Sequence, residues 1–85
     1  MFKNKTITGK NNICGKKIAE LRKNSIPKLS QRMLAEKLQL LGIDVDKNAI
    51  QRIESGQRYV TDLELLAFAR VFGIKCDELL QWYKL

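Results

Sequence analysis

Apolar residues recur at intervals of three and four along most of the chain, and this periodicity restricts the fold more than any other feature. Leu34, Leu38 and Leu41 show it in one segment, and residues at such spacing share one face of an α-helix. No run alternates apolar and polar side chains as a half-buried strand does. The chain has 85 residues, with one proline and five glycines. We therefore predict a single all-α domain.

Capping residues predict where the helices begin and end. Ser, Thr and Asp side chains accept hydrogen bonds from the first turn of a helix, and glycine often ends one by adopting a positive φ. Thr61 and Glu64 also have the spacing of a capping box. The predicted N-caps are Ser30, Asp46 and Thr61, and the predicted stops are Gly42, Ser55 with Gly56, and Gly73. Five helices result, over residues 12–24, 31–41, 47–54, 62–72 and 76–83.

The predicted helices each turn one apolar face toward a common core. The residues assigned to this core are Ile18, Leu21, Leu34, Leu38, Ile50, Ile53, Leu63, Leu66, Ala67 and Val71. The predicted domain covers residues 12–85, preceded by a flexible basic arm over residues 1–11.

Positive charge is concentrated toward the N-terminus. Residues 1–29 contain eight basic side chains and one acidic side chain, whereas residues 61–85 contain three basic and four acidic ones. This asymmetry indicates a polyanion bound toward the N-terminal side, with a solubilising lysine surface as the alternative. Lys3, Lys5 and Lys10 of the arm are candidates for contacts with phosphates.

Several classes of function find no support in the sequence. There is no histidine, Cys14 and Cys76 lie far apart among apolar residues, and no glycine-rich phosphate loop is found. We therefore expect no enzymatic activity, no metal, no cofactor and no small-molecule ligand, and reduced cysteines in a cytoplasmic protein. No apolar run is long enough to cross a membrane.

The segment DKNAIQRIESG, residues 46–56, predicts a strongly amphipathic helix. At about 100° per residue, Ala49, Ile50 and Ile53 occupy one arc. The opposite arc contains no acid, although an ordinary solvated face mixes acidic and basic residues. Its side chains are those whose geometry suits the edges of base pairs in the major groove. They are Lys47, Asn48, Gln51 and Arg52.

Four segments together resemble the phage repressor and Cro type of helix-turn-helix domain over residues 13–81. They read CGKKIAELRKNSI, LSQRMLAEKL, NAIQRIESGQR and DLELLAFARVFGIKCDELL. LSQRMLAEKL resembles the second helix of that family, and AIQRIESGQR resembles its recognition helix. The resemblance implies a five-helix repressor-like fold that binds double-stranded DNA.

The resemblance also implies roles for residues at matching positions. Lys47, Asn48, Gln51 and Arg52 would read bases, with phosphates as the alternative for Gln51 and Arg52. Gln31, Ser55, Gln57 and Arg58 would contact phosphates. Arg22 and Glu54 would form an internal ion pair.

Two links depart from the family pattern. The first, RKNSIPKLS, is longer than usual, and the route from Leu38 to Ile50 is longer by about five residues than a turn of three or four allows. We expect the second helix to gain about one turn, through Gln39, Leu40 and Leu41. The recognition helix could then be displaced or tilted.

The leading functional prediction is a sequence-specific transcriptional repressor that occupies operator DNA. Such domains usually bind as homodimers to two half-sites. Part of the C-terminal apolar segment is expected to cover the core, and the rest offers a dimer surface; the residues are Leu79, Leu80, Trp82, Tyr83 and Leu85. The alternative is a protein-interaction module of the same fold, such as an antitoxin or a coactivator adaptor.

Overall fold

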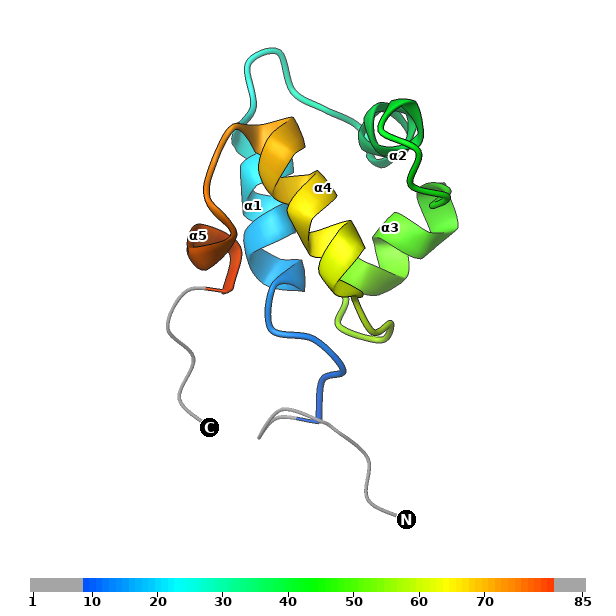
Figure 1. Ribbon diagram of the computed structural model, residues 1–85, viewed down its shortest axis with the longest axis vertical. Helices are drawn as coiled ribbons and strands as arrows, with labels where there is room; N and C mark the ends of the chain where they lie inside the picture. The colour runs from blue at the N-terminus through cyan, green and yellow to red at the C-terminus, as the bar shows by residue number, and fades with distance from the viewer. Residues whose placement is uncertain (1–8, 81–85) are drawn as a thin grey trace.

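The computed structural model describes residues 9–80, and all of its regular structure is helical. The helices are α1 (Gly15–Asn24), α2 (Gln31–Leu40), α3 (Lys47–Glu54), α4 (Asp62–Phe72) and α5 (Cys76–Leu80). Figure 1 shows α2 and α3 at one side of the molecule and α5 at the other, with α1 and α4 between them. The predicted all-α fold of five helices is confirmed.

Helices α2, α3 and α4 begin at the predicted caps, which are Ser30, Asp46 and Thr61. The Ser30 hydroxyl accepts from the Met33 amide at 3.0 Å. Thr61 accepts from the Glu64 amide at 3.1 Å, while a Glu64 carboxylate oxygen accepts from the Thr61 amide at 3.0 Å. These two bonds complete the predicted capping box, so α4 begins where the sequence indicated.

The first helix begins later than predicted, at Gly15 instead of Asn12. Asn12 lies outside the helix because its side chain has other partners. Its Oδ1 accepts from the Gly15 amide at 2.8 Å, and its Nδ2 donates to the carbonyl of Ile53 at 3.1 Å. The Asn12 side chain therefore accepts from the first amide of α1 and links the beginning of α1 to the end of α3.

The longer link between α2 and α3 folds back on the domain. The second helix reaches Leu40, so it gains most of the predicted extra turn. The side-chain amide of Gln39 donates to the Val45 carbonyl at 2.8 Å, and the backbone amide of Ile43 donates to the Leu38 carbonyl at 3.0 Å. Val45 is 2% exposed and joins the core. The extra residues thus supply a core side chain and do not separate α3 from α2, on which it packs.

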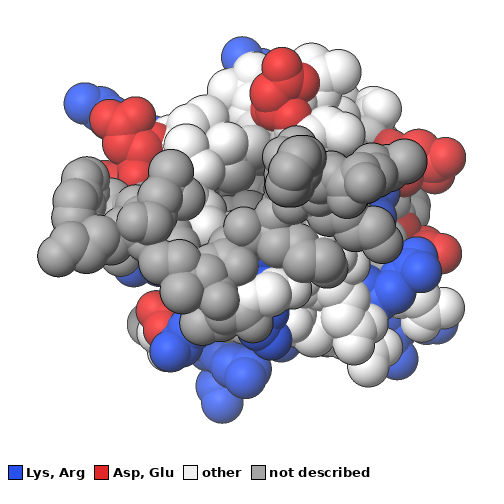
Figure 2. All heavy atoms as spheres, turned by 90° about the horizontal axis from the view of Figure 1, so that it is seen from below, with Lys and Arg blue, Asp and Glu red and all other residues white. Residues whose placement is uncertain are grey.

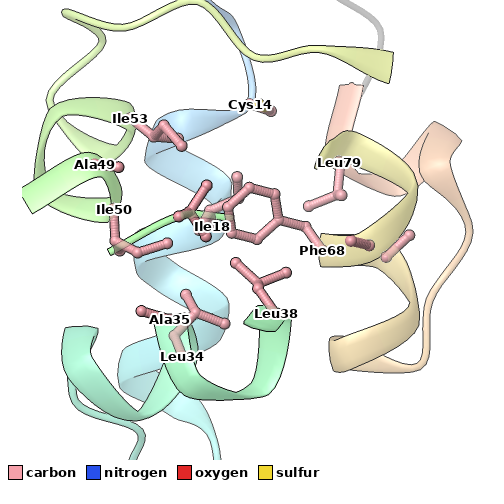
Figure 3. Close-up of a cluster of buried hydrophobic side chains, with 13 residues drawn as sticks. Cys14, Ile18, Leu34, Ala35, Leu38, Ala49, Ile50, Ile53, Phe68 and Leu79 are labelled. Atoms are coloured by element: carbon pink, nitrogen blue, oxygen red, sulfur yellow. The ribbon is translucent and has the colours of Figure 1, made fainter. Parts of the chain in front are cut away.

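The core is a single cluster to which all five helices or their caps contribute (Figure 3). Phe68 is fully buried at its centre, although the sequence analysis did not select it. Leu63 and Leu66 were assigned to the core, and this assignment is wrong: they are 67% and 42% exposed. The helix α4 is apolar on most sides, so periodicity could not identify its inner face. Phe68 and Ala67 form the inner face, because these two side chains are buried in the core.

Part of the C-terminal apolar segment was expected to cover the core, and Leu79 does so. Leu79 is 1% exposed and packs in the core, so it is not available to a second subunit. Leu80 is 41% exposed. Trp82, Tyr83 and Leu85, like Lys3 and Lys5 of the predicted arm, lie outside the described residues.

Candidate nucleic-acid interface

Helix α3 has one buried face and one exposed face. Ala49, Ile50 and Ile53 are 6%, 0% and 0% exposed and anchor the helix in the core. The polar side chains of the opposite arc all lie exposed; they are Lys47, Asn48, Gln51 and Arg52. The structure therefore brings the four predicted base-reading residues together on one solvent-facing surface.

The start of α3 is fixed by Asp46. Its carboxylate accepts a hydrogen bond from the Ala49 amide at 2.8 Å. This bond satisfies one of the amide groups that the first turn of a helix leaves without a partner. Lys47 and Asn48 occupy that first turn, so their backbone is held while their side chains remain in solvent.

The end of α3 turns sharply at Gly56, whose φ is +81°. The Gln57 amide donates to the Arg52 carbonyl at 2.8 Å, and the Ser55 hydroxyl donates to the same carbonyl at 3.1 Å. Ser55 and Gln57 themselves are exposed. The loop therefore presents these two predicted phosphate contacts beside the polar arc of α3.

A buried polar network joins α1, α2 and α3. Nε of Arg22 lies 2.7 Å from Oε2 of Glu54, and Nη2 lies 3.0 Å from Oε1. Nε2 of Gln31, at the start of α2, donates to Oε1 of Glu54 at 3.0 Å. The hydrogen bond to Glu54 raises the pKa of Arg22 and outweighs the effect of burial, so the guanidinium stays charged. The ion pair expected from the resemblance is thus present, and it also holds Gln31.

Arg58 has a structural partner that the sequence analysis missed. Its two terminal nitrogens donate to the two carboxylate oxygens of Glu64, each at 3.0 Å. Burial alone would raise the pKa of Glu64, but hydrogen bonds from Arg58 and from the Thr61 backbone lower it. The capping-box spacing identified Glu64 as a helix cap, but it carried no sign of this second role. Arg58 therefore also stabilises the fold, and its side chain is still 29% exposed, so its contact with phosphate stays a prediction.

The segment before α1 packs on the loop that follows α3. Nζ of Lys10 donates to the Ser55 carbonyl at 2.9 Å, and the Asn11 amide donates to the Gly56 carbonyl at 2.8 Å. The Asn11 side chain donates to the Gln57 carbonyl at 2.7 Å. Lys10 and Asn11 thus belong to the folded domain, and a charged amine lies beside the polar arc of α3.

Arg32 is a second candidate that the sequence analysis did not select. It is exposed in the first turn of α2, next to Gln31, which contacts the end of α3. The free amides of a helix N-terminus and a guanidinium both favour phosphate. Figure 2 shows that Lys and Arg side chains predominate along the lower edge of that view.

The described residues offer little to other kinds of chemistry. No group of three or more Cys, Asp or Glu side chains within residues 9–80 is placed to hold a metal. Burial raises the pKa of the Cys14 thiol to about 11, so it stays protonated and unreactive at neutral pH. None of the helices in the same part of the chain is long and apolar enough to cross a membrane.

A short all-α domain whose third helix packs on the second and turns a polar arc to solvent is a helix-turn-helix domain. The family model for helix-turn-helix proteins of the XRE type matches residues 18–79. Because the match covers most of the chain, the protein belongs to this family of DNA-binding regulators. The resemblance is therefore confirmed. Comparisons with curated proteins and with solved structures gave no match.

Proposed function

We propose that the protein is a sequence-specific transcriptional repressor that occupies operator DNA through α3. The observation that carries the proposal is the exposed, acid-free arc of α3, held at its start by Asp46 and at its end by the Arg22–Glu54 pair. Such side chains on a fixed helix can make two-point hydrogen bonds with guanine and adenine. In this proposal Lys47 and Asn48 read bases, and Gln51 and Arg52 contact bases or phosphates one turn later.

Phosphate contacts surround this arc in the proposal. Ser55, Gln57 and Arg58 supply them from the loop after α3, and Gln31 with Arg32 supply them from the start of α2. Lys10 adds positive charge beside Ser55. Such contacts set the position of the domain on the duplex and make its affinity depend on salt. Repression then follows from occupancy, because a bound domain excludes other proteins from the same DNA.

The test is a selection from random duplex DNA with the purified protein, followed by sequencing of the retained pool. The proposal expects a defined motif that is retained at moderate salt. A pool without a motif, together with binding that disappears as salt is raised, would show only an electrostatic footprint. That result would refute the proposal that the protein binds an operator.

The proposal also includes binding as a homodimer, because a twofold pair reads two half-sites about 10 base pairs apart. Of the predicted C-terminal dimer surface, Leu79 is buried and Leu80 is 41% exposed.

A further inference from the structure

A cluster of exposed leucines lies where the end of α2 meets α4. We name this surface the α2–α4 face and define it by Leu40, Leu41, Ile43, Leu63 and Leu66. Leu40 is 86% exposed and Leu63 is 67% exposed. Two adjacent hollows of about 170 and 250 Å³ lie on it and share Leu41 and Arg70. A contiguous exposed apolar patch of this kind marks an interaction site more often than single scattered apolar residues do.

The extra residues of the long α2–α3 link create most of this face. Leu40 is the last residue of α2, Leu41 follows it, and Ile43 lines the first hollow together with Leu63 and Leu66. The same link buries Val45 and is fastened by the bond from Gln39 to the Val45 carbonyl. The leucines are therefore held on a folded segment, and their exposure does not come from a loose loop.

Charges of opposite sign flank the two ends of the face. Lys37 lines the second hollow, and Arg70, near the C-terminal end of α4, lines both hollows. Asp62 is the first residue of α4, and Asp44 follows Ile43 in the chain; both are exposed, and their neighbours Leu63 and Ile43 line the first hollow. Among residues 9–80, none of these four side chains forms an ion pair. Asp62 and Arg70 are eight positions apart on α4, or about 12 Å along its axis. They do not neutralise each other within one subunit.

From this arrangement we infer that the α2–α4 face is a homodimer interface in which a second copy packs through the same face. A twofold axis in the plane of the face places the basic end of one copy against the acidic end of the other. The apolar residues then cover each other, and Arg70 of one copy meets Asp62 of its partner. Twofold interfaces require this self-complementarity. A wholly acidic or wholly basic partner would match only one end.

The inference does not need DNA, but its consequence for DNA rests on the proposed function. A pair of chains joined through this face carries two copies of α3. If each α3 reads one half-site, the distance between half-sites is set by this interface. The lengthened α2–α3 link would then define both the dimer and its operator spacing.

Sedimentation equilibrium of the full chain without DNA tests the inference. The wild-type protein is expected to show a monomer–dimer equilibrium. Leu40→Lys should weaken dimerisation by roughly tenfold to a hundredfold, as loss of an apolar interface contact does. The variant should fold normally, because Leu40 is 86% exposed and a cation is favoured at a helix C-terminus. Ile26→Ser is the matched control, since Ile26 is 99% exposed but lies on the link between α1 and α2.

A charge exchange tests the orientation of the two copies. Arg70→Asp and Asp62→Arg should each weaken the dimer, and the double variant should restore it. Restoration is expected only from pairing between copies, because the two positions are about 12 Å apart within one chain. Helical circular dichroism and thermal melting of each variant exclude misfolding as the cause.

Three outcomes would overturn the inference. The wild-type protein could remain monomeric at every concentration, Leu40→Lys could dimerise like the wild type, or Ile26→Ser could weaken the dimer as much as Leu40→Lys. Selection from random duplex DNA tests DNA binding independently of this dimerisation experiment. A dimer that retains no motif refutes sequence-specific DNA binding and leaves this interface standing. A monomer that retains a motif refutes this interface and leaves sequence-specific DNA binding standing.

Discussion

The guanidinium of Arg22 and the carboxylate of Glu54 meet through two hydrogen bonds, of 2.7 and 3.0 Å. The side chains are only 12% and 9% exposed, so this is a largely desolvated pair. It connects α1 with the last residue of α3. Because Arg22 also donates to the Leu29 carbonyl at 3.1 Å, the same guanidinium fixes the link that leads into α2. One arginine therefore connects α1, the link into α2 and the end of α3.

Breaking this pair should destabilise the fold strongly. In Glu54→Gln the partly buried guanidinium loses its counter-charge, and we expect the free energy of unfolding to fall by roughly 1.5–3 kcal/mol, the range for hydrogen bonds to charged groups. Urea denaturation measures the change. Glu36→Gln is the control, because Glu36 is exposed on α2 and should change stability by less than about 0.5 kcal/mol. Equal stability of the two variants would contradict a structural role for the pair.

Local signals in the sequence predicted the helices well. Asp46 and Thr61 each begin a helix as expected, because a cap involves residues only three positions apart. The periodicity of α3 placed Ile50 and Ile53 inside and the polar arc outside for the same reason. Contact of that arc with bases remains a prediction, since periodicity reports exposure and not a ligand.

The features that the sequence did not reveal depend on packing between distant segments. Asn12 is 41 residues from Ile53, whose carbonyl it holds, and no local pattern indicates that bond. The inner face of α4 was predicted only in part: Ala67 was assigned to the core correctly, but Phe68 was missed because the helix is apolar on most sides. The partner of Arg58 was missed because the loop geometry after α3 brings it to Glu64.

The Arg58–Glu64 pair should make stability depend on acid pH. Its hydrogen bonds hold the pKa of Glu64 below its ordinary value of 4.5. The native state therefore binds this proton more weakly than the unfolded chain does. The stabilisation is present above that ordinary value and is lost as pH falls through the lowered pKa. Urea denaturation at a series of pH values measures the loss.

Glu64→Gln provides the matched comparison for that series. The amide oxygen of glutamine can still accept from the Thr61 backbone, so the variant removes mainly the charge. We expect it to be less stable than the wild type by about 1–2 kcal/mol near neutral pH, with a smaller difference in acid. A difference that stays constant across the whole range would show that the charge of Glu64 does not contribute.

Gly15 marks the closest approach of α1 to α3. A Cβ at this position would collide with the backbone carbonyl of Ile53 and lie 2.9 Å from the Asn12 side-chain oxygen. Because the obstacle is backbone, relief requires α1 and α3 to separate. Gly15→Ala should lower the free energy of unfolding by about 2–3 kcal/mol, as overpacking does, and should weaken any DNA binding that depends on α3.

Gly42→Asn is the control for this substitution. Gly42 has a φ of +82° and open space around its Cβ position, and asparagine tolerates that conformation better than other residues do. The free energy of unfolding of Gly42→Asn should differ from that of the wild type by less than about 1 kcal/mol. If Gly15→Ala is as stable as this control, the two helices do not pack as closely as the structure shows.

Asn48 should determine the choice of one base pair. It lies exposed in the first turn of α3, where a side-chain amide can make two hydrogen bonds with adenine. Once a motif is known, Asn48→Ala should lose about 1–3 kcal/mol of discrimination at one position and leave the other positions unchanged. Competition binding with single-base variants of the site measures this. Lys75→Ala, on the link between α4 and α5 away from α3 (Figure 1), should leave every position as it was. A uniform loss across all positions in Asn48→Ala would instead mean that Asn48 contacts the DNA backbone.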